Sequence, residues 1–146
     1  MISRGASTSN PGPNVQSSST KPSDGLVLLV EDEESLGDLL VHLLGRAKIR
    51  ALRAGDGNQA LQIFSDHQRE IVMAFVDCRL PDIDGGDLCR ELRRLSPGLP
   101  LLLTSGRDQR ALVTSLAGGG RTGFLQKPYM PADVVRHVNA LLSQPA

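Results

Sequence analysis

Three stretches of the chain are continuously apolar, and each ends at a polar residue. They run over residues 26–30, 71–76 and 99–103. An apolar run without alternation is typical of a strand that is covered on both faces, as in a parallel α/β sheet. Two more strands are predicted. Residues 49–53 alternate apolar and basic, as on an exposed edge strand, and residues 122–125 form a short fifth strand.

The segments between these strands have the spacing of amphipathic helices. After the first strand, leucines recur on one face, which predicts burial of Leu36, Leu39, Leu40, Leu43 and Leu44. A second helix is expected over residues 58–67. The third helix is expected to turn Leu88, Leu92 and Leu95 inward and Arg90, Glu91, Arg93 and Arg94 mostly outward.

The last two helices are predicted from weaker signals. A fourth helix over residues 108–117 stops at three consecutive glycines. A fifth begins near Pro131, a favourable first-turn residue, and is expected to bury Val134, Val135, Val138, Leu141 and Leu142. Strand and helix therefore alternate five times, which predicts an α/β fold. We expect a doubly wound, five-stranded parallel sheet of order 2-1-3-4-5 with five helices, flavodoxin-like, and a crevice between the ends of strands one and three.

Composition limits the domain organisation and the partners. The chain has 146 residues and a net charge of zero, which gives no electrostatic reason to expect binding to nucleic acid or to a membrane. Residues 1–24 are rich in Ser, Pro and Gly, and we expect a disordered tail or linker there, a domain over 25–143 and a short tail over 144–146. No secretory signal or membrane-spanning run is visible, and the spacing of Cys78 and Cys89 is not that of metal ligands, so a cytoplasmic location is expected.

The polar residues at the strand ends indicate the chemistry. Glu31 and Asp32 follow the first strand, Asp77 the third, Thr104 the fourth and Lys127 the fifth. In this topology all these ends face one crevice, where three carboxylates meet a single cation. Two carboxylates about 4 Å apart repel by about 4 kcal/mol at an effective dielectric constant of about 20. Such a cluster either protonates in part or binds a cation.

Hard carboxylate oxygens favour Mg²⁺, or Mn²⁺ in its place, as the bound ion. The chemistry that this predicts is attack by the Asp77 carboxylate on a phosphoryl group, giving an acyl phosphate. Lys127 and the Thr104 hydroxyl would then stabilise the phosphoryl oxygens. Each residue alone has an ordinary explanation: Asp77 could cap a turn, Glu31 and Asp32 could start a helix, Thr104 could be an ordinary strand-end hydroxyl and Lys127 a solvated lysine. Only the set is specific.

The chain resembles the receiver domains of two-component response regulators. The matching segments, ordered and correctly spaced over about residues 25–143, are 29–33 (LVEDE), 54–61 (AGDGNQAL), 76–77 (VD), 80–82 (LPD), 84–85 (DG), 103–106 (LTSG) and 124–128 (FLQKP). The resemblance implies that Asp77 is the phosphoacceptor of a sensor histidine kinase or histidine phosphotransfer protein. It also implies a signalling module that is not an enzyme beyond its own phosphorylation and dephosphorylation.

The resemblance implies further roles in the same site. Glu31, Asp32, Asp77 and the backbone carbonyl of Arg79 would hold the metal. Thr104 and Phe124 would be the switch residues, and the Lys127–Pro128 bond would be cis. No further cofactor is implied. A downstream protein target, with or without a homodimer, would use the fourth helix, fifth strand and fifth helix.

The chain departs from the family pattern at a few positions. Glu31 stands where Asp is commonest, Phe124 has no hydroxyl, and residues 118–123 are rich in glycine. Arg79, two residues after the acceptor, is hypothesised to overhang the phosphoryl group and to slow attacking water.

Two other functions stay open at this point. One is a receiver-shaped interaction module that takes no phosphate. The other is an aspartate-nucleophile phosphohydrolase, although Arg79 occupies the position of its second acid. The cognate kinase, the target and the choice between a stand-alone receiver and part of a hybrid kinase are not specified by the sequence.

Overall fold

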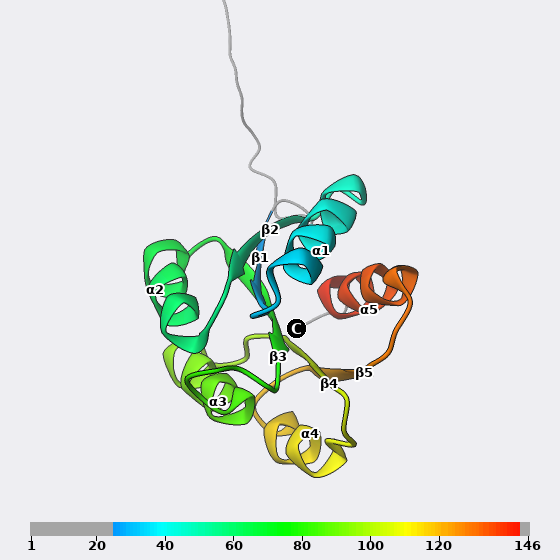
Figure 1. The fold of residues 1–146 in the computed structure, drawn as a ribbon. Helices are drawn as coiled ribbons and strands as arrows, with labels where there is room; N and C mark the ends of the chain where they lie inside the picture. Colours follow the sequence, from blue (N-terminus) through cyan, green and yellow to red (C-terminus); the bar gives the residue numbers. More distant parts are fainter. Residues whose placement is uncertain (1–24, 144–146) are drawn as a thin grey trace, which may run out of the picture.

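Strands and helices alternate along residues 25–143, the part of the chain that the computed structural model describes (Figure 1). The strands are β1 (Leu26–Val30), β2 (Arg50–Ala54), β3 (Ile71–Asp77), β4 (Leu101–Ser105) and β5 (Thr122–Gln126). The helices are α1 (Glu34–Arg46), α2 (Gly57–His67), α3 (Gly85–Leu95), α4 (Arg110–Ala117) and α5 (Pro131–Ser143). The tails expected at 1–24 and 144–146 lie outside the described residues.

The strands form one parallel sheet of order β2-β1-β3-β4-β5, so the predicted fold class is confirmed. The pairing aligns the carboxyl ends of the inner strands. Val30 of β1 pairs with Val76 of β3, and Asp77 pairs with Thr104 of β4. The polar residues that follow the strands therefore meet at one edge of the sheet.

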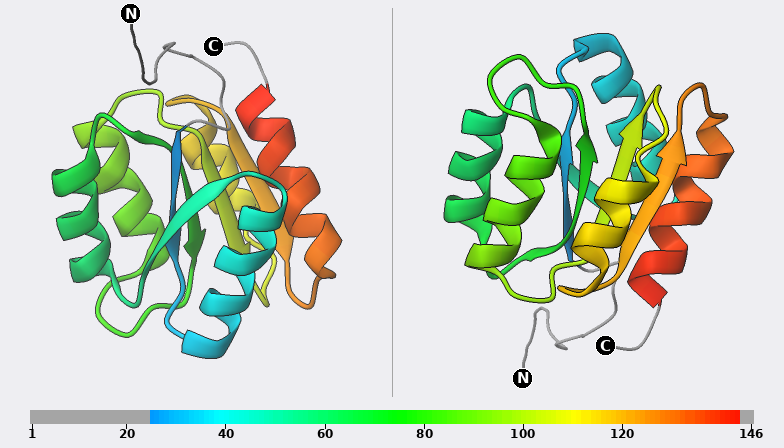
Figure 2. Two further views of the ribbon diagram at one scale, coloured as in Figure 1. Left: turned by 90° about the horizontal axis from the view of Figure 1, so that it is seen from above. Right: turned by 90° about the horizontal axis from the view of Figure 1, so that it is seen from below.

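Helices cover both faces of this sheet. Helices α1 and α5 lie on one face, and α2, α3 and α4 lie on the other (Figures 1 and 2). Successive residues of β1 alternate between the two resulting cores: Leu28 and Val30 pack with α2 and α3, whereas Val27 and Leu29 pack with α1 and α5. Burial on both faces is the physical reason for the unbroken apolar runs in the sequence.

Two strands begin later than the sequence predicts. Ile49 lies outside β2 because its N–H bonds the Leu44 carbonyl at 2.8 Å, in the turn that ends α1. Leu99 and Pro100 lie outside β4, which begins at Leu101 with an N–H bond to the Arg121 carbonyl. Proline has no N–H to offer a ladder, so the strand starts after it. Helix α4 begins at Arg110, two residues later than predicted at 108.

Three predicted side-chain orientations are wrong. Leu39 and Leu95 were expected inside, but they are 46% and 37% exposed. Arg93 was expected outside, but it is only 9% exposed. Its guanidinium donates to the carbonyls of Leu99, Leu116 and Arg121 and to Thr122 Oγ1. These acceptors lie just before β4, at the end of α4 and at the start of β5, so the Arg93 side chain connects the ends of three elements to α3.

Candidate functional site

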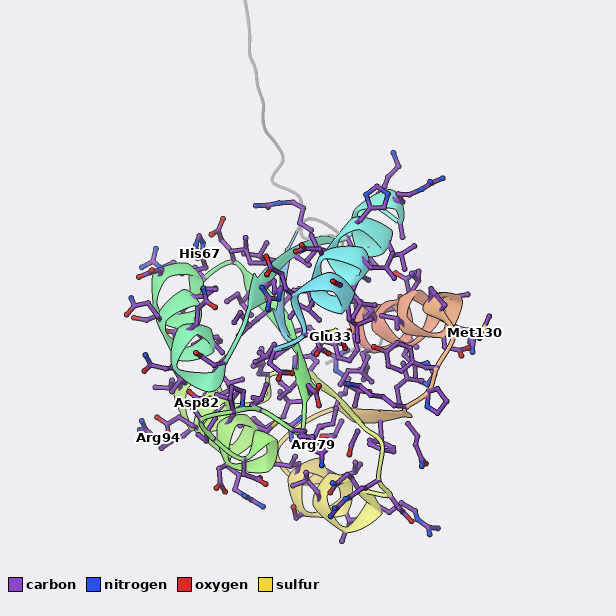
Figure 3. All side chains as sticks on the ribbon, viewed as in Figure 1. Glu33, His67, Arg79, Asp82, Arg94 and Met130 are labelled. Carbon is purple, nitrogen blue, oxygen red and sulfur yellow. The ribbon has the colours of Figure 1, made fainter. Side chains whose placement is uncertain are left out.

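The structure brings the predicted strand-end residues together. Carboxylate oxygens of Glu31, Asp32 and Asp77 lie within 4.8 Å of one another, so among the described residues these three could hold a metal ion. Lys127 reaches the same cluster, since its Nζ is 2.9 Å from Asp77 Oδ2 and 3.7 Å from Glu31 Oε1. In Figure 3, Glu33 and Arg79, from the loops after β1 and β3, flank the strand ends near the centre, while His67 and Met130 lie at the margin.

Asp77 is buried at the end of β3, and its two carboxylate oxygens have different partners. Oδ1 accepts the N–H of Arg79 at 2.9 Å, and Oδ2 accepts from the Lys127 ammonium. The neighbouring peptide is fixed as well, because Cys78 N–H donates to the Thr104 carbonyl at 2.9 Å. The carboxylate is therefore held by the backbone on one side and by a cation on the other.

The Glu31 carboxylate has a perturbed pKa. It is 2% exposed, and its burial raises the pKa from 4.5 to about 7. The N–H of Glu33, 3.1 Å from Oε2, and the charge of Lys127 oppose this rise, while the charges of Asp77 and Asp32 add to it. Near neutral pH, Glu31 is therefore shared between its charged and neutral forms in the absence of a metal ion.

Lys127 follows β5, and its N–H donates to the Ser105 carbonyl at 2.8 Å. Burial by itself lowers the pKa of Lys127, but the hydrogen bond to Asp77 and the charges of Glu31 and Asp77 outweigh it and raise the pKa overall. Lys127 is therefore charged at physiological pH. The Lys127–Pro128 peptide bond is cis, as predicted.

The loop after β3 approaches the site closely. An ideal Cβ at Gly85 would lie 2.4 Å from Cys78 Cα and 2.8 Å from the Asp77 carbonyl oxygen, so only glycine fits there. The next helix starts at once: Asp84 caps α3 by accepting from the N–H groups of Gly86 and Asp87. The Arg79 N–H and Gly85 contacts thus hold both ends of this loop against Asp77.

A pocket of about 400 Å³ opens above Asp77. It is lined by Asp77, Cys78, Arg79, Asp84, Ser105, Gly106, Arg107, Gln109 and Lys127. Beside it, the Thr104 Oγ1 is buried and has no hydrogen-bond partner among the described residues. Carboxylate oxygens, an ammonium and an unpaired hydroxyl match what a hard divalent cation and a phosphoryl group require.

Phe124 does not belong to this cluster of charges. It lies within β5 opposite Leu103 and packs, partly buried, against the core on the side of α2, α3 and α4. Two residues near the site were not predicted. Tyr129 has a buried hydroxyl that bonds no partner in the described part of the chain, and Arg53 reaches the turn after β1. A tyrosine after Lys-Pro and an arginine on an edge strand are ordinary sequence features, so no pattern distinguished them.

Comparisons with known proteins concern the fold and the family of the chain. The family model for the response regulator receiver domain matches residues 27–139. The chain is 34% identical over 120 residues to the sensory transduction protein RegX3 of Mycolicibacterium smegmatis, covering 82% of this chain and 51% of that protein. It is 30% identical over 118 residues to the sensor kinase CckA of Brucella abortus, covering 81% of this chain and 12% of that kinase.

Solved structures show the same fold. The crystal structure of a response regulator receiver domain protein from Clostridium thermocellum matches with a TM-score of 0.72 at 21% identity, over 81% of this chain and 94% of that one. The chain spans about half the length of the first curated regulators that it matches (51% and 48%). Among the described residues, no helix is long and apolar enough to cross a membrane.

Proposed function

Because this chain belongs to the response regulator receiver domain family, we propose that it is a phosphoacceptor whose Asp77 carboxylate receives a phosphoryl group in a Mg²⁺-dependent reaction. One observation carries the proposal. Three carboxylates, a lysine bonded to one of them and a buried threonine hydroxyl, which bonds nothing else within residues 25–143, converge at one edge of the sheet. The family accounts for the architecture, and these side chains account for the chemistry.

The donor is a phosphohistidine on a sensor histidine kinase or histidine phosphotransfer protein. An Asp77 oxygen attacks phosphorus, the new O–P bond forms as the P–N bond breaks, and the electron pair returns to the imidazole. Glu31, Asp32, Asp77 and the Arg79 carbonyl would hold Mg²⁺, which when bound offsets negative charge on the carboxylates and the phosphoryl oxygens.

The residues of this chain supply the remaining steps. The acyl phosphate leaves Asp77 without its own carboxylate charge, so the Lys127 ammonium turns to a phosphoryl oxygen. The buried Thr104 hydroxyl then donates to another phosphoryl oxygen and gains the partner that it lacks in the unmodified site. The Phe124 side chain, which packs through apolar contacts, moves inward after Thr104. This movement changes the surface formed by α4, β5 and α5, to which a downstream protein or a second copy of the chain binds.

The test is intact mass after incubation of the full chain with acetyl phosphate and Mg²⁺. The wild-type chain is expected to gain the mass of one phosphoryl group, and this gain should vanish in Asp77→Asn and in the presence of EDTA. Asp84→Asn is the matched control, because it changes an acid of the same pocket and keeps a side chain that caps α3 well. No gain in the wild-type chain from acetyl phosphate or from a phosphohistidine donor would leave only an interaction module with the receiver fold.

A further inference from the structure

A second cation reaches the turn that carries Glu31 and Asp32, and it does so through the main chain. Arg53 lies in β2, the neighbour of β1 in the sheet. Its Nε donates to the Glu31 carbonyl at 3.0 Å, and its Nη2 donates to the Asp32 carbonyl at 3.3 Å. One guanidinium therefore donates to the carbonyls of two consecutive residues whose side chains belong to the acidic cluster.

Strand β2 bonds both the N–H and the carbonyl groups of this turn. The residue after Arg53, Ala54, accepts the N–H of Glu31 at 3.0 Å through its carbonyl. Within residues 25–143, Glu33 at the N-cap of α1 makes no side-chain capping bond, although its N–H donates to Glu31 Oε2 at 3.1 Å. The peptides of Glu31 and Asp32 are thus both held by hydrogen bonds from β2.

A glycine in α1 makes room for the arginine. An ideal Cβ at Gly37 would lie 2.4 Å from Arg53 Cδ and 2.5 Å from Arg53 Nε. Glycine inside a helix costs about 1 kcal/mol relative to alanine. The passage of Arg53 over α1 explains why this buried helical position carries glycine, and it links the two residues physically.

Arg53 and Lys127 approach the same cluster in different ways. Lys127 bonds a carboxylate oxygen of Asp77, which a metal ion would also use. Both hydrogen bonds of Arg53 within the described residues go to peptide carbonyls, so they leave the carboxylate oxygens of the cluster free. Its fork of N–H donors fits two adjacent carbonyls, a geometry that lysine cannot reproduce.

We propose that Arg53 is a positioning residue of the metal site, which holds the Glu31 and Asp32 peptides so that both carboxylates face a divalent cation. The inference rests on the proposed function, in which that cation is Mg²⁺. It makes a prediction opposite to that of simple electrostatics. Removing a positive charge near a cation site should tighten Mg²⁺ binding if charge alone matters, whereas loss of a positioning contact should weaken it.

The experiment is calorimetric titration of the full chain with Mg²⁺. Arg53→Met is expected to weaken binding about tenfold, as is typical when a supporting contact of a metal site is lost. Arg53→Lys keeps the positive charge but lacks the planar set of N–H donors, so it should also bind Mg²⁺ more weakly than the wild-type chain. Arg50→Met is the matched control, because it removes an exposed arginine from the same strand and should leave binding unchanged. Equal or tighter binding in Arg53→Met would overturn the inference.

Gly37→Ala tests the same contact from the other side. Its Cβ would displace the Arg53 side chain, so it should weaken Mg²⁺ binding as Arg53→Met does. In an Arg53→Ala background the space is empty, and Gly37→Ala should then cause no further loss of affinity. Additive losses in the double variant would mean that the two residues act independently, which contradicts the proposal.

A readout without metal separates this inference from the proposed function. In EDTA, Arg53→Met should speed hydrogen exchange at the Glu33 amide, whose bond to Glu31 Oε2 depends on the turn. If the wild-type chain binds no Mg²⁺ and takes up no phosphoryl group, the proposed function fails. If it does both and Arg53→Met matches it in affinity and exchange, only the role of Arg53 fails.

Discussion

Replacing Glu31 by Gln should stabilise the metal-free protein above neutral pH. Burial is the largest cause of the raised pKa of Glu31, about 7 against 4.5 for an unperturbed group, so folding favours its neutral form. That contribution is fully present below pH 4.5 and is lost as the pH rises through about 7, because the unfolded chain releases the proton first. A shift of this size corresponds to at most about 3 kcal/mol. Gln keeps an oxygen that can accept the Glu33 N–H.

The assay is urea denaturation in EDTA at several pH values between 4.5 and 8. The difference in unfolding free energy between Glu31→Gln and wild type should grow across this window and level off near pH 8. Glu34→Gln changes an exposed acid at the start of α1 and should follow the wild-type curve. Curves for Glu31→Gln and wild type that stay parallel at all pH values would refute the assignment of Glu31 as a buried, perturbed acid.

Magnesium should reduce the difference in unfolding free energy between Glu31→Gln and the wild-type protein. At a ligand concentration 100 times its dissociation constant, binding stabilises the folded state by about 2.7 kcal/mol. Glu31→Gln loses one of the oxygen ligands of the cluster, so its gain from Mg²⁺ should be smaller and its advantage at pH 8 should shrink. An equal gain in both proteins would place the ion away from Glu31.

Three further predictions concern single residues. Arg93→Met should lower the unfolding free energy by about 3 kcal/mol, because the Leu99 carbonyl and the other acceptors lose the hydrogen bonds of a buried guanidinium, while phosphorylation measured by intact mass persists; Arg94→Met, an exposed neighbour, should change stability little. Gly85→Ala should lower both the melting temperature and the phosphorylated fraction, since its Cβ would strike the Cys78 and Asp77 backbone. Arg79→Ala should shorten the phosphoryl lifetime followed by mass, if the exposed guanidinium slows attacking water as hypothesised; an unchanged lifetime would contradict this.

The order of the elements could be predicted from the sequence because a strand that is buried on both faces has apolar side chains at successive positions. Unbroken apolar runs mark β1, β3 and β4, and the strand-end acids lie at one edge by topology alone. The same reasoning gave a wrong prediction for Leu39, because helical periodicity shows which face is apolar but not how far the neighbouring elements extend over it. The prediction for Arg93 is wrong because its partners are carbonyls at the ends of other elements, and no local sequence pattern indicates them.

The candidate site was predictable to the same extent. Residue type and position identified Glu31, Asp77 and Lys127 as a set, because parallel strands bring their carboxyl ends to one edge of the sheet, although each residue alone has an ordinary explanation. Arg53 was interpreted as an edge-strand charge, which is the usual role of a basic residue at such a position. Its contact with the turn after β1 depends on the rotamer of a long side chain and on the absence of a Cβ at Gly37, and both are properties of the packed structure.

The balance of charge explains why the site calls for a divalent ion. Three carboxylates and the Lys127 ammonium leave two negative charges when Glu31 is ionised, and one divalent cation neutralises them. A monovalent cation would leave one charge uncompensated in a partly buried site, where repulsion is costly. Arg53 bonds the peptide carbonyls of the turn and not the carboxylates, so it leaves the ligand oxygens of the cluster open. Lys127, in contrast, bonds Asp77 directly, and a divalent ion that shared Asp77 would free its ammonium for the phosphoryl oxygens.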